Sequence, residues 1–119
     1  MAGINLNGFG YNEFESVTTT KTFDEGDSGV VQNVTASTTV TLPATVVGTC
    51  YVVRVGADGI TVNVSPAAAD KIMGNGFTSA DNKDLIFTSQ PKGSYVVLVA
   101  DGVNGWFVHR IKGTATREA

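Results

Sequence analysis

The chain has 119 residues, of which 42% are hydrophobic and 16% charged, and its 8 basic and 11 acidic residues give a formal net charge of −3. This is the length of one ordinary domain, too apolar for global disorder and without the cluster of cations that binding to nucleic acid requires. Val contributes 17 residues and Thr 15, against 4 Leu, which excludes a helical bundle because β-branched residues favour strands over helices.

The first residues, Met1–Asn12, have the composition of an N-terminal arm, so we divide the chain into an arm at 1–13 and a domain at 14–119. Glycines and asparagines alternate with single apolar residues, without a helical period or a clean strand alternation. Two interpretations remain open, a frayed terminus and an arm that docks on a neighbouring subunit. The second predicts a protein interface formed by Ile4, Leu6, Phe9, Tyr11 and Phe14.

From Phe14 onward, short β-branched stretches alternate with turn clusters. Several stretches alternate apolar and polar residues, the pattern of a strand with one face on a core and the other in water. We expect strands at Phe14–Phe23, Val30–Val34, Thr38–Leu42, Cys50–Val55, Ile60–Val64, Lys71–Met73, Leu85–Thr88, Ser94–Ala100 and Trp106–Ile111. About eight or nine strands at this spacing indicate an all-β fold, an antiparallel β-sandwich or jelly-roll-like domain with an extended N-terminal arm.

Two turns predict hairpins. Ala57–Gly59 contains Asp-Gly between two strands, which is the strongest local hairpin signal in the chain. Asp101–Gly105 has two glycines and joins the last two strands. In the final strand, alternation predicts Trp106, Val108 and Arg110 on one face and Phe107, His109 and Ile111 on the other.

No residue pattern supports catalysis or a metal site. His109 and Cys50 are the only histidine and cysteine, and each lies in an apolar strand without a signature that would pair base and nucleophile. We expect Cys50 to behave as a small buried hydrophobic residue. The acidic turns at 24–27 and 81–84 lack the calcium-loop pattern, and turn geometry explains their composition. We therefore predict no enzyme activity, no catalytic, cofactor or metal residues, and no small-molecule substrate.

The chain also lacks membrane and targeting features. The longest apolar run, Tyr95–Ala100, is far shorter than a membrane span. The first residues have neither the positive region nor the apolar region of a secretory signal. We expect no membrane partner, and an address in the cytosol or in a particle assembled there.

Several strings occur in a distinctive order along the chain: Lys21-Thr22-Phe23, Asp27–Val34, Thr38–Pro43, Thr61–Pro66, Asp70–Gly74 and Ala100–Trp106. Together they resemble small structural proteins of tailed bacteriophages, most of all head decoration (cement) proteins, and also modules of tail or fibre tips. The resemblance covers the chain from about Thr20 to the C-terminus, and the arm lies outside it.

The resemblance implies a module that works by binding and has no catalytic residues. A decoration protein would bind the outer surface of the head and stabilise capsomer contacts. Its partners would be the major capsid protein and itself, as a homotrimer, on the capsid exterior of a virion assembled in the bacterial host cytoplasm. The alternative is a receptor- or glycan-binding module of a tail tip or fibre. There Trp106 would be the sugar platform, helped by Tyr51 or Tyr95. We favour the other interpretation of Trp106, as an anchor of the core after the hairpin, because a Trp side chain carries much of a small core's buried area.

Overall fold

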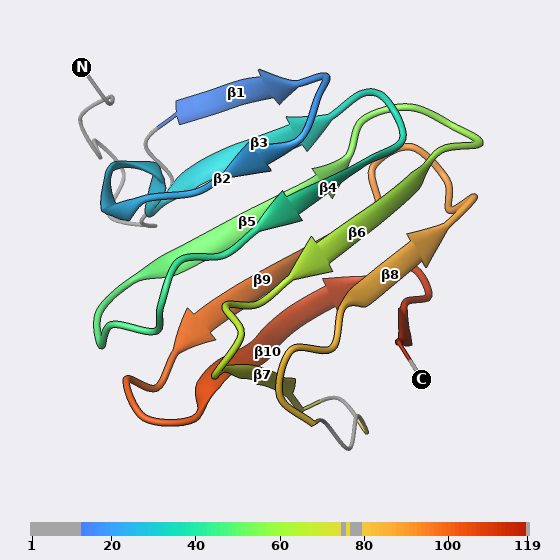
Figure 1. Cartoon of the computed structure of the whole chain (residues 1–119). Coiled ribbons are helices and arrows are strands. Elements are labelled where there is room, and N and C mark those ends of the chain that lie inside the picture. The colour runs from blue at the N-terminus through green and yellow to red at the C-terminus, as the bar shows by residue number, and fades with distance from the viewer. Residues whose placement is uncertain (1–12, 75, 77–79, 119) are drawn as a thin grey trace.

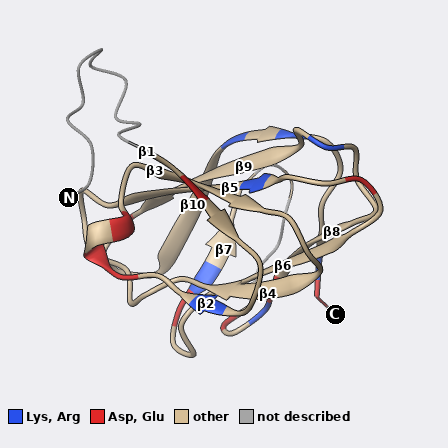
Figure 2. Ribbon diagram, turned by 90° about the horizontal axis from the view of Figure 1, so that it is seen from above, with Lys and Arg blue, Asp and Glu red and all other residues tan. Residues whose placement is uncertain are grey.

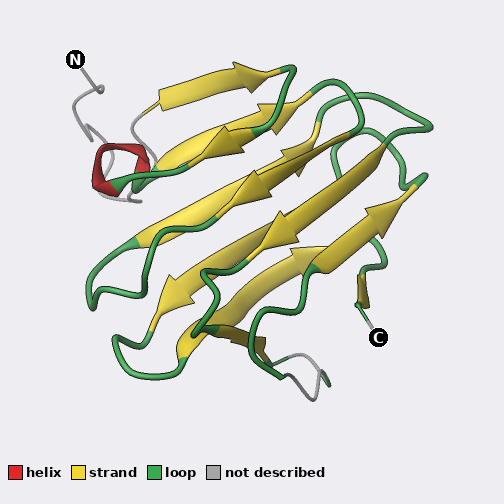
Figure 3. Cartoon of the chain, in the orientation of Figure 1, coloured by secondary structure: helices red, strands yellow, loops and turns green. Residues whose placement is uncertain are grey.

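Strands dominate the computed structural model, which describes residues 13–74, 76 and 80–118 (Figures 1 and 3). The elements in chain order are β1 (Glu13–Val17), β2 (Lys21–Thr22), the 3-10 helix η1 (Glu25–Asp27), β3 (Val30–Val34), β4 (Thr38–Thr41), β5 (Cys50–Val55), β6 (Thr61–Ser65), β7 (Lys71–Met73), β8 (Leu85–Thr88), β9 (Tyr95–Ala100), β10 (Gly105–Lys112) and β11 (Thr116–Arg117). The prediction of an all-β protein is confirmed, and β11 is a short strand that the sequence pattern did not predict.

Consecutive strands alternate between two sheets through most of the chain. The larger sheet has the order β1-β3-β5-β9-β10-β7, and the smaller has the order β11-β8-β6-β4-β2. After each strand from β1 to β5 the chain crosses to the other sheet. Strands of the same sheet therefore pair in parallel, as β1–β3 and β3–β5 in the larger sheet and as β2–β4 and β4–β6 in the smaller. The first half of the chain therefore winds as a coil of strands that alternate between the two sheets, and Figure 1 shows these sheets lying one over the other.

The prediction of a uniformly antiparallel domain is wrong. Among the described residues, β1–β3, β3–β5, β2–β4, β4–β6 and β7–β10 run parallel. The antiparallel pairs are β5–β9, β9–β10, β6–β8 and β8–β11. The hairpin predicted at Asp101–Gly105 is confirmed, since it joins β9 to β10.

Two local predictions are wrong because the chain crosses between sheets where the sequence indicates continuity. The strand predicted at Phe14–Phe23 is divided into β1 and β2, which belong to different sheets. The turn at Ala57–Gly59 is not a hairpin, because β5 lies in the larger sheet and β6 in the smaller. In that turn the Asp58 carboxylate accepts a 2.7 Å hydrogen bond from the backbone N–H of Lys92, so a neighbouring loop holds the crossing.

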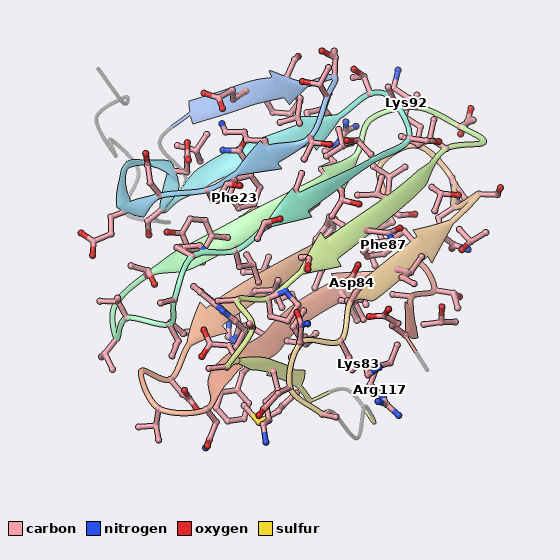
Figure 4. The ribbon with its side chains drawn as sticks, viewed as in Figure 1. Phe23, Lys83, Asp84, Phe87, Lys92 and Arg117 are labelled. Carbon is pink, nitrogen blue, oxygen red and sulfur yellow. The ribbon has the colours of Figure 1, made fainter. Side chains whose placement is uncertain are left out.

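The core lies between the sheets and is made from the inward residues of both. Figure 4 labels Phe23 and Phe87, which are among its largest members. The buried cluster is Val17, Phe23, Val34, Val40, Leu42, Tyr51, Val53, Val55, Val62, Val64, Ile72, Leu85, Phe87, Val96, Leu98, Ala100 and Trp106. Valine predominates because β-branched side chains pack well on pleated strands.

A polar cluster closes the core at its β1–β2 end. The Lys21 ammonium on β2 donates to the Glu15 carboxylate on β1, and it lies 3.3 Å from Asp27 Oδ1 and 3.2 Å from Gln32 Oε1. Burial lowers the pKa of Lys21, but the hydrogen bond to Glu15 and the charge of Asp27 outweigh it, so this pKa is raised. Inward-pointing charge at an edge strand discourages pairing with another chain.

Candidate functional site

The larger sheet has a row of residues across its outer face, one from each of five neighbouring strands. Because side chains alternate between the two faces of a strand, the neighbours of the core residues point outward. The register aligns these outward positions on β1, β3, β5, β9 and β10 as Phe14, Val31, Val52, Val97 and Arg110. The row is apolar in its first four positions and ends in a cation.

An open groove with a volume of about 370 Å³ follows this row; its lining residues are Phe14, Val31, Val52, Arg54, Tyr95, Val97 and Arg110. Val52 and Val97 form its floor and are only 4% and 2% exposed, although neither belongs to the core cluster between the sheets. Phe14 forms one rim and is 61% exposed. The groove is thus a covered apolar floor beside an accessible aromatic ring.

Two arginines make the rim of the groove positive. The Arg54 guanidinium donates to Asn33 Oδ1 and lies 5.8 Å from the centre of the Phe14 ring. Arg110 forms no salt bridge with any residue in the described part of the chain. Figure 2 shows the charged residues separated by long uncharged stretches of strand. The lining residues of the groove include two arginines and no Asp or Glu, so its local charge is positive in a chain whose net charge is −3.

A β-bulge places Arg110 on the outer face. Val108 pairs with Leu98, but the next pair along the strands is Arg110 with Val97, which leaves His109 as the extra residue. The prediction that Arg110 shares the face of Trp106 is therefore wrong. Ile111 is turned inward by the same shift and packs against the core.

Within the part of the chain that the structure describes, no hydrogen bond joins His109 to Cys50. His109 is exposed, and Cys50 is half-buried on the outer face, which corrects the expectation that it lies buried. Burial raises the pKa of the Cys50 thiol. In the acidic turn, the Asp24 carboxylate accepts from the Gly26 N–H and the Asp27 carboxylate accepts from the Asp24 N–H. These carboxylates therefore cap η1.

No group of three or more His, Cys, Asp or Glu side chains in the described residues is arranged to hold a metal ion. Nor does any helix in this part of the chain have the length and apolar character needed to cross a membrane.

The structure describes one of the five predicted interface residues. Ile4, Leu6, Phe9 and Tyr11 lie outside the described residues, whereas Phe14 lies on β1 and lines the groove. The three residues proposed for sugar binding differ in their burial. Trp106 and Tyr51 are fully buried, which excludes both as sugar platforms, and Tyr95 is half-buried in the groove wall.

The sequence patterns do not predict that the valine floor, Arg54 and Arg110 form one site. A signal for the floor exists in the strings Cys50–Val55 and Tyr95–Ala100, which are apolar at nearly every position. Strands buried on both faces have continuous apolar runs of this kind, whereas strands with a wet face alternate. Such runs indicate an outer surface that is itself apolar.

Comparison of the chain with protein-family models, with curated proteins and with solved structures gave no match.

Proposed function

We propose that this protein is a decoration (cement) protein of a tailed bacteriophage, a sandwich-like module that binds the outside of the head and stabilises capsomer contacts. The observation that carries the proposal is the outer face of the larger sheet, where Phe14 stands exposed beside an apolar groove. Apolar surface of this kind on a small domain is typical of a protein interface. The resemblance of the strand strings to phage virion proteins supplies the kind of partner.

The residue types around the groove suit binding between proteins. Tyrosine and arginine are enriched among residues that dominate binding energy, and interface centres are depleted of acidic side chains. Tyr95, Arg54 and Arg110 flank the apolar floor. The groove thus combines an apolar centre with a donor-rich rim, and we propose that it contacts the major capsid protein.

The proposal includes a homotrimer on the capsid exterior and no catalytic role. Residues 1–12 would reach a neighbouring subunit or the capsid through their apolar side chains. A standard interface buries ~800 Å² per partner, and linked subunits multiply the effect of each contact. A small chain with no chemistry of its own could thereby stabilise a large shell.

The direct test is to add the purified protein to expanded heads that lack it and to count bound copies by quantitative mass spectrometry. We expect hundreds of copies at saturation and a rise in the temperature at which the heads lose their DNA. A handful of copies, or copies confined to the tail, would contradict the proposal, and the second result would favour a tail-tip module.

A pair of variants links this test to the groove. Val31→Asp places a charge in the outward row and should reduce the number of bound copies. Val103→Asp is the matched control, because Val103 is 80% exposed in the hairpin between β9 and β10 and does not line the groove. Equal binding by both variants, each shown to be folded by circular dichroism, would exclude the groove as the contact surface.

A further inference from the structure

We propose that the groove on the outer face of the larger sheet binds an extended acidic–apolar segment of a partner protein. An aromatic or aliphatic side chain of that segment lies on the valine floor, and a neighbouring carboxylate pairs with Arg54 and Arg110. This inference rests on the proposed function only for the identity of the protein that carries the segment.

The lining of the groove suits an apolar occupant. Val31, Val52 and Val97 lie side by side on three neighbouring strands, and Phe14 and Tyr95 rise at the edges. The row crosses five strands, which corresponds to about 19 Å at the usual spacing between strands. That span is long enough for a short peptide segment. Removing its apolar side chains from water would favour binding.

The two arginines favour an anion at the rim of the groove. Arg54 lies opposite Tyr95 on one side of β9, and Arg110 lies opposite Val97 on the other side, so both guanidinium groups flank the same stretch of β9. Arg54 donates to a neutral amide oxygen of Asn33, and Arg110 has no acidic partner in the described residues. A carboxylate that binds here beside apolar surface would form charge-assisted hydrogen bonds in a partly dry site.

The same charges argue against the other occupants. Residues 1–12 contain no Asp or Glu, so this segment cannot supply the carboxylate, and Glu13 lies in β1, where it pairs with Val30 of β3. A second copy packed face to face would bring Arg54 and Arg110 of one subunit towards the same residues of the other, because a two-fold interface is self-complementary. Like charges placed across an interface disfavour association. An acidic–apolar segment satisfies both the floor and the rim.

The test is selection from a displayed library of random twelve-residue peptides on the immobilised full-length protein. We expect enriched peptides that contain an aromatic or aliphatic residue next to Asp or Glu. Nuclear magnetic resonance should map the selected peptide to Val31, Val52 and Val97. Absence of enrichment, a consensus without an acidic residue, or mapping to another surface would overturn the proposal.

Substitutions then test the charge pairing with the selected peptide. Arg110→Gln should weaken its binding at least tenfold, and exchanging the acidic residue of the peptide for its amide should have a similar effect. Arg117→Gln is the matched control, because Arg117 lies on β11 of the smaller sheet (Figure 4) and should leave the affinity unchanged. Equal affinity for Arg110→Gln and the wild type would refute the carboxylate pairing.

Two further measurements separate the alternative occupants. If deletion of residues 1–12 raised peptide affinity, the groove would belong to the arm. If dodecanoate bound as tightly as the peptide, the groove would belong to a small apolar acid. Either result would overturn the proposal. Because neither the peptide selection nor these controls use virions, failure here and failure of head binding are distinguishable.

Discussion

Tyr51 meets Trp106 edge-on in the core, with ring centroids 5.2 Å apart and ring planes at 69°. Phe23 stacks on Tyr51 at 5.5 Å and 13°. Tyr51 and Trp106 belong to the larger sheet, whereas the Phe23 backbone donates to Thr41 O at the end of β4 in the smaller sheet. The three rings therefore connect the two layers, and aromatic pairs in such geometry add about 0.5–1.5 kcal/mol beyond area burial.

Replacing Trp106 should damage stability. Because Trp106 is fully buried, we expect Trp106→Ala to lower the free energy of unfolding by about 3–5 kcal/mol, measured by urea denaturation. The neighbouring Phe107 points outward and is 45% exposed, so Phe107→Ala should lower this free energy by only about 1 kcal/mol. Similar losses for both variants would contradict the assignment of Trp106 to the core.

Tyr51 should make stability fall at high pH. Its hydroxyl donates a 2.8 Å hydrogen bond to Asp24 O. Burial, and then the charges of Asp27 and Asp24, raise the pKa of Tyr51 to about 12. Because the unfolded pKa is about 10, the neutral phenol stabilises the fold fully below about pH 10, and this contribution is lost as the pH rises towards 12.

Tyr51→Phe tests this dependence. We expect a loss of about 1 kcal/mol at neutral pH, because the hydrogen bond is removed. We also expect a shallower decline of stability between about pH 10 and 12. The raised pKa of Lys21 gives both proteins a common alkaline loss, so the informative quantity is the difference between their urea-unfolding curves at each pH. A difference that stays constant with pH would contradict the raised pKa of Tyr51.

Lys21 should stabilise the β1–β2 end of the fold through its ion pairs with Glu15 and Asp27. Lys21→Met leaves Glu15 and Asp27 facing each other without the cation, and we expect it to cost about 1–3 kcal/mol in the free energy of unfolding. Adding Glu15→Gln should recover part of this loss because it removes one of the repelling charges. Lys92 is exposed, so Lys92→Met serves as the control and should be nearly neutral. No recovery in the double variant would exclude charge repulsion as the cause.

Gly105 should tolerate no side chain. It has a φ of 146°, and a Cβ atom there would overlap the Lys71 carbonyl oxygen where β10 pairs with β7. Gly59 has a φ of 77° but open space around it, so Gly59→Ala should cost only the backbone strain of about 1–2 kcal/mol. We expect Gly105→Ala to lower the thermal midpoint clearly more than Gly59→Ala. Equal midpoints would show that β7 can move away without cost.

Local sequence patterns predict most strands and their inward residues. Four predicted strands, Val30–Val34, Cys50–Val55, Lys71–Met73 and Leu85–Thr88, have the observed bounds. Alternation in Thr38–Leu42 places Val40 and Leu42 inward, and both are buried. This works because the two-residue period is a property of the extended backbone itself and needs no knowledge of the partner strand.

The pairing of strands, and the face of the sheet to which some side chains point, depend on contacts between residues far apart in the sequence. Ala57–Gly59 has the composition of a hairpin turn, yet it connects β5 of the larger sheet to β6 of the smaller, and its Asp58 carboxylate accepts a hydrogen bond from the backbone N–H of Lys92. The bulge at His109 turns Arg110 to the outer face, where it meets Val97 and completes the groove.

The sequence by itself determined the all-β class, the positions of most strands and a core rich in valine. Only the tertiary structure decided that the first half of the chain pairs its strands in parallel and that one row of outward residues, four apolar and one cationic, crosses five strands. The reason is physical: alternation sets which face of a strand is apolar, whereas long-range hydrogen bonds set which strands, and therefore which outward side chains, become neighbours.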